Sequence, residues 1–194
     1  MKIANWLLLA FACIGHSHAQ HKWILAKNNN GIQVFVSQIS DSEYYAFKAV
    51  MSVKSSEAEI IGVIRDVNNY PKWFAYTASA KLTGQSTNEQ SFFMETDYPW
   101  PYSNECLSYN MKLEKEPDRS QKITITKAEK NVTCKYSLKK ANGYILLEPN
   151  GGGTKITYYF HSEPSQNIPP WLINPRIHEM PYQTFISLKK QLKV

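Results

Sequence analysis

The sequence predicts an α+β fold in which a curved antiparallel sheet wraps around one long C-terminal helix and encloses an internal hydrophobic cavity. Three observations predict it. Short strand-like runs fill most of the chain, one helical segment interrupts them after the second run, and a longer helical segment ends the chain. Strand runs with segregated helices are typical of α+β folds. A helix that covers the concave face of a sheet without filling it leaves room for a ligand.

The first nineteen residues have the pattern of a signal peptide. Lys2 supplies a positive charge, residues 6–12 form a short apolar run, and residues 17–19 form a small-x-small cleavage site. The run is shorter than the roughly 20 apolar residues of a membrane-spanning helix. We therefore expect cleavage after Ala19, export to the periplasm or beyond the cell, and one domain over residues 20–194. Lipidation of Cys13 is the alternative, which the bulky residue two positions before it disfavours.

The first two strands and the first helix follow in order. Alternating apolar residues over 31–36 and the apolar run over 44–53 predict two strands. Ser55 and Ser56, followed by glutamates, are typical of a helix start, and the apolar stripe after them continues to Asp66. Residues 68–71 predict a break in the chain.

Six further strands and the terminal helix complete the predicted fold. The strands are expected at 78–83, 91–96, 106–113, 122–128, 143–147 and 154–160, the last two joined by a glycine-rich hairpin turn at 150–153. Residues 168–171 open the terminal helix. Its apolar face consists of Ile177, Met180, Phe185, Leu188 and Leu192. Pro175 and Pro181 predict a kink or an interruption near its start.

Charge and cysteine content limit the partners that we expect. The formal net charge is +6, but the basic residues are dispersed and form no continuous block. Such dispersion is typical of a solvated surface, with weak attraction to anionic membranes as the alternative, and we expect no nucleic acid partner. Cys106 and Cys134 are an even pair in an exported chain, which favours a disulfide over two free thiols. The histidines lie far from both cysteines in sequence, so we expect no metal site.

Five segments in a constant order resemble the STAR-related lipid-transfer (START) family in its small exported bacterial form. They are the Trp23 opening with residues 31–35, then 64–73, the Pro-Trp-Pro segment at 97–103, residues 143–158, and 168–174 before 181–185. The resemblance implies the helix-grip fold, an internal tunnel for a lipid or sterol, no cofactor, and the C-terminal helix as a lid. One departure concerns the contact with the polar head group of the ligand. After Ser103 comes Asn104-Glu105, and the arginine that usually supplies this contact in the family is missing.

The expected ligand contacts are aromatic and methionine side chains of the strands, the loops and the lid. Alternate residues of a strand face opposite sides of the sheet, so an error of one residue would invert each assignment. The expected residues are Trp73, Met94, Trp100, Tyr109, Met111, Tyr144, Phe160, Trp171, Met180 and Phe185. The three tryptophans also fit purely structural packing.

The expected function is non-catalytic binding of a hydrophobic ligand, and two alternatives stay open. We expect a monomer that binds a lipid or another hydrophobic small molecule and touches membrane surfaces transiently. A helix-grip aromatase or cyclase would need polar groups that move protons, for which Tyr109, Glu95 and His161 are candidates without a recognisable spacing. The chain contains no nucleophile elbow, zinc-protease motif or dinucleotide fingerprint. A protein-interaction module with a collapsed core is the third interpretation.

Overall fold

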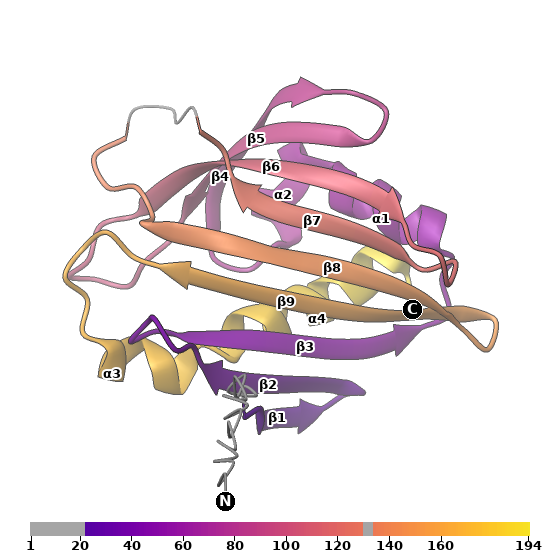
Figure 1. Ribbon diagram of the computed structural model, residues 1–194, viewed down its shortest axis with the longest axis horizontal. Coiled ribbons are helices and arrows are strands. Elements are labelled where there is room, and N and C mark those ends of the chain that lie inside the picture. Colours follow the sequence, from indigo (N-terminus) through magenta and orange to yellow (C-terminus); the bar gives the residue numbers. More distant parts are fainter. Residues whose placement is uncertain (1–21, 130–133) are drawn as a thin grey trace, which may run out of the picture.

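The computed structural model describes residues 22–129 and 134–194. They form one nine-stranded antiparallel sheet with helices packed on one of its faces (Figure 1). The predicted α+β fold with a C-terminal helix against a curved sheet is confirmed. The predicted signal peptide, the cleavage site after Ala19 and Cys13 lie outside the described residues. Among the described residues, no helix is both long enough and apolar enough to cross a membrane.

The sheet joins the beginning of the chain to its end. Its strands are β1 (Ile24–Asn29), β2 (Ile32–Gln38), β3 (Tyr45–Val53), β4 (Thr77–Gln85), β5 (Glu89–Thr96), β6 (Glu105–Lys115), β7 (Gln121–Lys127), β8 (Lys140–Asn150) and β9 (Gly153–Glu163). Their order is β1-β2-β3-β9-β8-β7-β6-β5-β4, so β3 pairs with β9. Strand β1 was not expected, because its residues show no alternation and are mostly exposed.

The helices lie on the concave face. They are α1 (Glu57–Arg65), η1 (Val67–Asn69), α2 (Tyr70–Trp73), α3 (Pro170–Ile173), η2 (Asn174–Arg176) and α4 (Glu179–Leu192). Helix α1 begins with a capping box, in which the Ser56 hydroxyl accepts from the backbone of Glu59 and the Glu59 carboxylate accepts from the backbone of Ser56. The predicted break at 68–71 is wrong. The chain stays helical there because Pro71 occupies the first turn of α2, where a missing N–H costs no helical bond.

The C-terminal segment is divided rather than continuous. Helix α3 is followed by η2, which contains Pro175, and α4 begins three residues after η2 ends. Pro181 does not kink α4, because it is the third residue of that helix and its nitrogen would have no helical acceptor. Helix α4 runs behind β9 and β3, while α1 and α2 lie behind the other half of the sheet (Figure 1). The core fills the space between these helices and the sheet.

A disulfide joins Cys106 at the start of β6 to Cys134. The backbone beside it is paired as well, since the Cys106 N–H donates to the Tyr136 carbonyl at 3.0 Å. The part of the β7–β8 connection around Tyr136 is thereby held against β6. This is the pairing that the cysteine content favours.

Candidate ligand-binding cavity

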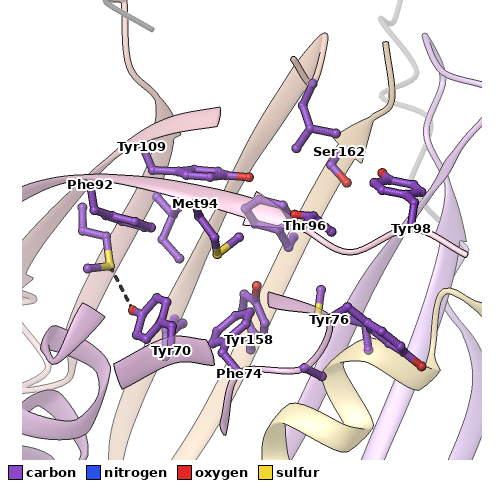
Figure 2. A pocket seen from close by; sticks show the side chains of 17 residues that line it. Tyr70, Phe74, Tyr76, Phe92, Met94, Thr96, Tyr98, Tyr109, Tyr158 and Ser162 are labelled. Carbon is purple, nitrogen blue, oxygen red and sulfur yellow. Dashed lines mark hydrogen bonds between the residues drawn. The ribbon is translucent and has the colours of Figure 1, made fainter. Parts of the chain in front are cut away.

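A cavity of about 80 Å³ lies between the concave face of the sheet and the helices that cover it (Figure 2). Strands β5 to β9 supply one wall. The cover consists of Tyr70, the α2–β4 connection at Phe74 to Tyr76, and Met180 at the start of α4. The strand residues enter by alternation, as Phe92, Met94 and Thr96 of β5 illustrate. The cavity is therefore framed by a rigid sheet on one side and by short segments on the other.

One end of the cavity is aromatic and apolar. The rings of Phe92 and Tyr109 stack with their centroids 5.2 Å apart, and Tyr70 meets Phe92 edge to face at 5.9 Å. The Tyr70 hydroxyl donates to the Ile64 carbonyl and lies 3.8 Å from the Met111 sulfur, the contact dashed in Figure 2. Burial raises the pKa of Tyr70 far above its usual range, with a smaller contribution from Asp66. This ring is thus fixed by packing and by a hydrogen bond.

The other end carries hydroxyl groups. Thr96, Tyr98 and Ser162 lie together there, and the phenol oxygens of Tyr109 and Tyr158 point into the space between the two ends (Figure 2). Burial raises the pKa of Tyr98, Tyr109 and Tyr158 above that of free tyrosine. For Tyr98 the negative charge of Glu105 adds to the effect of burial. These phenols are therefore neutral at physiological pH.

Helix α4 is attached to the first hairpin by polar contacts. The Lys27 ammonium lies 3.0 Å from a Glu179 carboxylate oxygen, and the Asn30 amide donates to the Tyr182 hydroxyl at 2.8 Å. The hydrogen bond from Lys27 lowers the pKa of Glu179, against a smaller opposing effect of burial. The helix is also tied to the α2–β4 connection, where the Ala75 N–H donates to the Thr184 hydroxyl at 3.3 Å.

Five of the residues expected at the ligand do line the cavity. They are Met94, Tyr109, Met111, Phe160 and Met180. The first four follow from strand alternation, and Met180 follows from the apolar face of the terminal helix. The structure thus brings together side chains from three strands and helix α4.

The assignment of Tyr144 to the concave face is wrong. Tyr144 lies on the convex face, where its ring stacks on Tyr159 with centroids 5.3 Å apart. In the β8–β9 ladder Gly143 is opposite Phe160, so the inward positions of β8 are Gly143 and Ile145. A side chain at Gly143 would collide with Phe160 and the backbone beside it, and glycine leaves that space to the Phe160 ring.

None of the three expected tryptophans lines the cavity, and they differ in where they lie. Trp100, expected at the wall or mouth of the cavity, and Trp171, expected as a contact of the lid helix, are 92% and 73% exposed and do not line the cavity. Both lie outside the strands, where alternation gives no direction. Trp73 is buried, but it packs behind the lining against Tyr70 at 5.5 Å. Phe185 likewise supports the lining from behind, 6.4 Å from the ring of Tyr158.

Several lining residues were not expected from the sequence. Tyr158 shares a face with Phe160 by the two-residue period, so the signal for it was present. Tyr76 and Tyr98 stand in connections between elements, and only the tertiary structure brings them to the cavity. No pattern in the sequence marks such positions.

The polar groups considered for an enzyme do not form one site. Tyr109 faces the cavity, whereas Glu95 alternates with Met94 and Thr96 and faces the other side of β5. Glu95 is bonded there to Ser79 and Asn104. His161 lies between the inward residues Phe160 and Ser162, and its ring nitrogen contacts Ser42 at 3.2 Å.

Comparison with known proteins agrees with this geometry. No family model matches the chain. The chain is 30% identical to an uncharacterized protein of Pseudomonas aeruginosa, over 92% of this chain and 90% of that one. It is 24% identical to the phosphatidylcholine transfer protein of Mus musculus, over 78% of this chain and 75% of that one.

Two solved structures are similar to this chain to different degrees. A STAR-related lipid transfer protein from Xanthomonas axonopodis superposes with a TM-score of 0.83 at 28% identity, over 89% of this chain and 99% of that one. An aromatase/cyclase from Streptomyces shares the fold alone, with a TM-score of 0.50 at 12% identity over 76% of this chain and 93% of that one. The chain belongs to the STAR-related lipid transfer (START) family.

Proposed function

We propose that this protein is a non-catalytic carrier that binds one lipid or other hydrophobic small molecule in the cavity and releases it when α4 moves. The observation that carries the proposal is the composition of the lining: apolar and hydroxyl side chains, with no charged group among the described residues that line it. Apolar surface removed from water contributes about 25 cal/mol per Å². A ligand that buries roughly 200 Å² would thus gain about 5 kcal/mol before the costs of binding are subtracted.

The size of the cavity implies that the cover moves. At about 80 Å³ the cavity is smaller than the roughly 300–1,000 Å³ of typical ligand pockets. A lipid can be accommodated only if the cover shifts. Helix α4 is the element best placed to shift, because the ion pair that attaches it to the first hairpin is partly exposed. The Lys27 and Glu179 side chains have 26% and 33% of their surface accessible.

We place the exchange of ligand at a membrane surface. The loop that contains the exposed Trp100 and the segment that leads to the exposed Trp171 are joined by two hydrogen bonds between Ser103 and Gln166, of 3.0 and 2.7 Å. Tyr98 of the first loop lines the cavity. Tryptophan favours the interface between water and lipid, where its apolar ring is buried and its N–H stays hydrated. These loops would hold the hydroxyl end of the cavity at the bilayer.

We further propose that the protein works after export, in the periplasm or outside the cell. The signal-peptide pattern of the first nineteen residues is one support. The Cys106–Cys134 disulfide is a second, since disulfides persist in oxidising compartments. Cell fractionation with detection of the protein, and the N-terminal sequence of the recovered chain, test this placement.

The first experiment is native mass spectrometry with organic extraction of the protein purified from the cells that make it. A lipid bound at one per chain would establish the carrier and give its ligand. An empty protein that gains no thermal stability from sterols, fatty acids, isoprenoid alcohols or phospholipids would contradict the proposal. Chemical conversion of an added aromatic or polyketide substrate would favour the aromatase/cyclase alternative instead.

The membrane step predicts a specific loss. Replacing both Trp100 and Trp171 by alanine should slow transfer of the bound lipid between vesicles about tenfold, equivalent to about 1.4 kcal/mol of interfacial binding. Leu25→Ala is the matched control, since Leu25 is also exposed but lies on the edge strand β1. Equal transfer rates in the double variant and the wild type would exclude these tryptophans from membrane contact.

A further inference from the structure

The hydroxyl end of the cavity has hydrogen-bonding groups that find no partner among the described residues. Within 22–129 and 134–194, the side-chain hydroxyls of Tyr98, Tyr109 and Tyr158 make no hydrogen bond to another described residue. Tyr109 and Tyr158 are nevertheless buried, with 2% and 3% of their surface accessible. Buried phenols normally find a partner, because an unpaired polar group away from water is costly. Their hydroxyls face the cavity, so a ligand is the natural partner (Figure 2).

The described lining offers these hydroxyls no neighbouring cation that could receive an anionic group. None of the described residues that line the cavity is a lysine, arginine or histidine. The charge that acts on Tyr98 and Tyr109 is instead negative and comes from Glu105. This fully buried carboxylate accepts backbone hydrogen bonds from Ser165 and Gln166, each of 2.9 Å, so it is anchored behind the hydroxyl end.

Such surroundings discriminate between ligands by charge. A carboxylate or a phosphate placed at the hydroxyl end would lose its hydration without gaining a counter-ion, and Glu105 would repel it. An alcohol or a carbonyl oxygen pays a much smaller desolvation cost and can exchange hydrogen bonds with neutral phenols. The apolar end around Phe92 and Met111 suits hydrocarbon.

We propose that the cavity selects an uncharged lipid with an alcohol or carbonyl oxygen at one end, and that Tyr98, Tyr109 and Tyr158 bind this oxygen. The ligand class is thus neutral oxygenated lipids, and it excludes fatty-acid anions and phospholipids. This inference rests on the carrier function proposed above, and it adds the charge and the polar group of the ligand.

Pairs of ligands that differ only in charge and polar group test the proposed selection of uncharged lipids. Farnesol and farnesyl phosphate share one chain, and cholesterol and cholesterol sulfate share one ring system. Dissociation constants from competition with a fluorescent hydrophobic probe should favour the neutral member of each pair by at least about tenfold. Equal or tighter binding of the anionic members, or of phosphatidylcholine taken from vesicles, would overturn this inference. The proposed carrier function would still stand. Binding of no lipid at all would overturn the carrier function as well.

Variants that remove only hydroxyls test the residues. In the double variant Tyr98→Phe with Tyr158→Phe, affinity for farnesol should fall about tenfold, whereas affinity for farnesene, which lacks the oxygen, should not change. Tyr144→Phe on the convex face is the control and should bind both ligands like the wild type. The farnesene value also reports whether the double variant keeps a folded cavity. Unchanged farnesol affinity in a variant that still binds farnesene would exclude these hydroxyls from recognition.

Discussion

Two covers close the same concave face, and they are held in different ways. On one side, α1 and α2 are fixed by the capping box of Ser56 and Glu59, by the buried Tyr70 hydroxyl, and by Trp73 against neighbouring rings. On the other side, α4 is attached to the first hairpin by the Lys27–Glu179 ion pair and the Asn30–Tyr182 hydrogen bond.

The difference indicates which cover would move in the proposed release. The contacts of Tyr70 and Trp73 in α2 are buried. The ion pair of α4 is partly exposed, and such pairs contribute about 0.2–1 kcal/mol each. Phe185 and Leu188 of α4 are buried, but hydrocarbon from a ligand could replace part of their contacts. In the proposed release, α2 would stay in place and α4 would be displaced together with its partly exposed ion pair.

The stationary wall should carry the larger share of stability. Trp73→Ala should lower the free energy of unfolding by about 3–5 kcal/mol, because it leaves a cavity among packed rings. Urea denaturation followed by far-ultraviolet circular dichroism measures this loss. Trp171→Ala is the control for removing an exposed indole and should change stability by less than about 0.5 kcal/mol. A loss of less than about 1 kcal/mol in Trp73→Ala would contradict the view that α1 and α2 form the stationary wall.

The movable cover should respond in exchange rate rather than in stability. Glu179→Gln breaks the ion pair with Lys27, so the rate of ligand release should rise roughly threefold while the free energy of unfolding falls by less than about 1 kcal/mol. Stopped-flow release of a fluorescent ligand to acceptor vesicles measures the rate. Glu148→Gln is matched, since Glu148 pairs with Lys155 at 2.8 Å with 34% of its side chain accessible, and it should leave release unchanged. A release rate equal to wild type in Glu179→Gln would remove the ion pair from the gate.

Acid should weaken the same contact by a smaller amount. The pKa of Glu179 is lowered in the folded protein from its ordinary value of 4.5, chiefly by the hydrogen bond from Lys27. A lowered pKa means that the contact stabilises the closed cover above about pH 4.5 and loses that contribution as the pH falls through the folded-state value. Release should therefore accelerate below pH 4.5 in the wild type, with less acceleration in Glu179→Gln. Identical pH profiles for the two proteins would contradict this assignment.

Local patterns predicted most of the fold and about half of the site. The strands follow from alternation, and for Met94, Tyr109, Met111 and Phe160 the same alternation places the side chains at the cavity. Alternation alone did not place Tyr144 correctly. The register between β8 and β9, which puts Gly143 opposite Phe160, is set by the pairing of the two strands.

Residues outside regular elements were beyond such reasoning. Trp100 and Trp171 stand in segments bounded by prolines, where neither the strand period nor the helix period gives a direction. Tyr98 reaches the cavity from the β5–β6 connection. Its position depends on the loop that Asn104 holds through a hydrogen bond of 3.3 Å to the Tyr98 N–H, a contact that no periodic pattern reveals.

The pairing of β3 with β9 also governs how this protein folds. Phe47 is opposite Phe160 in that ladder, so residues more than half of the chain apart must meet before the middle of the sheet exists. Closing so long a loop costs entropy before any contact repays it, and chains with such distant contacts fold slowly. A chain that ends before Gly153 would lack the central strand that joins β3 to β8. The protein is therefore committed to folding as one unit, late, once its last strand is available.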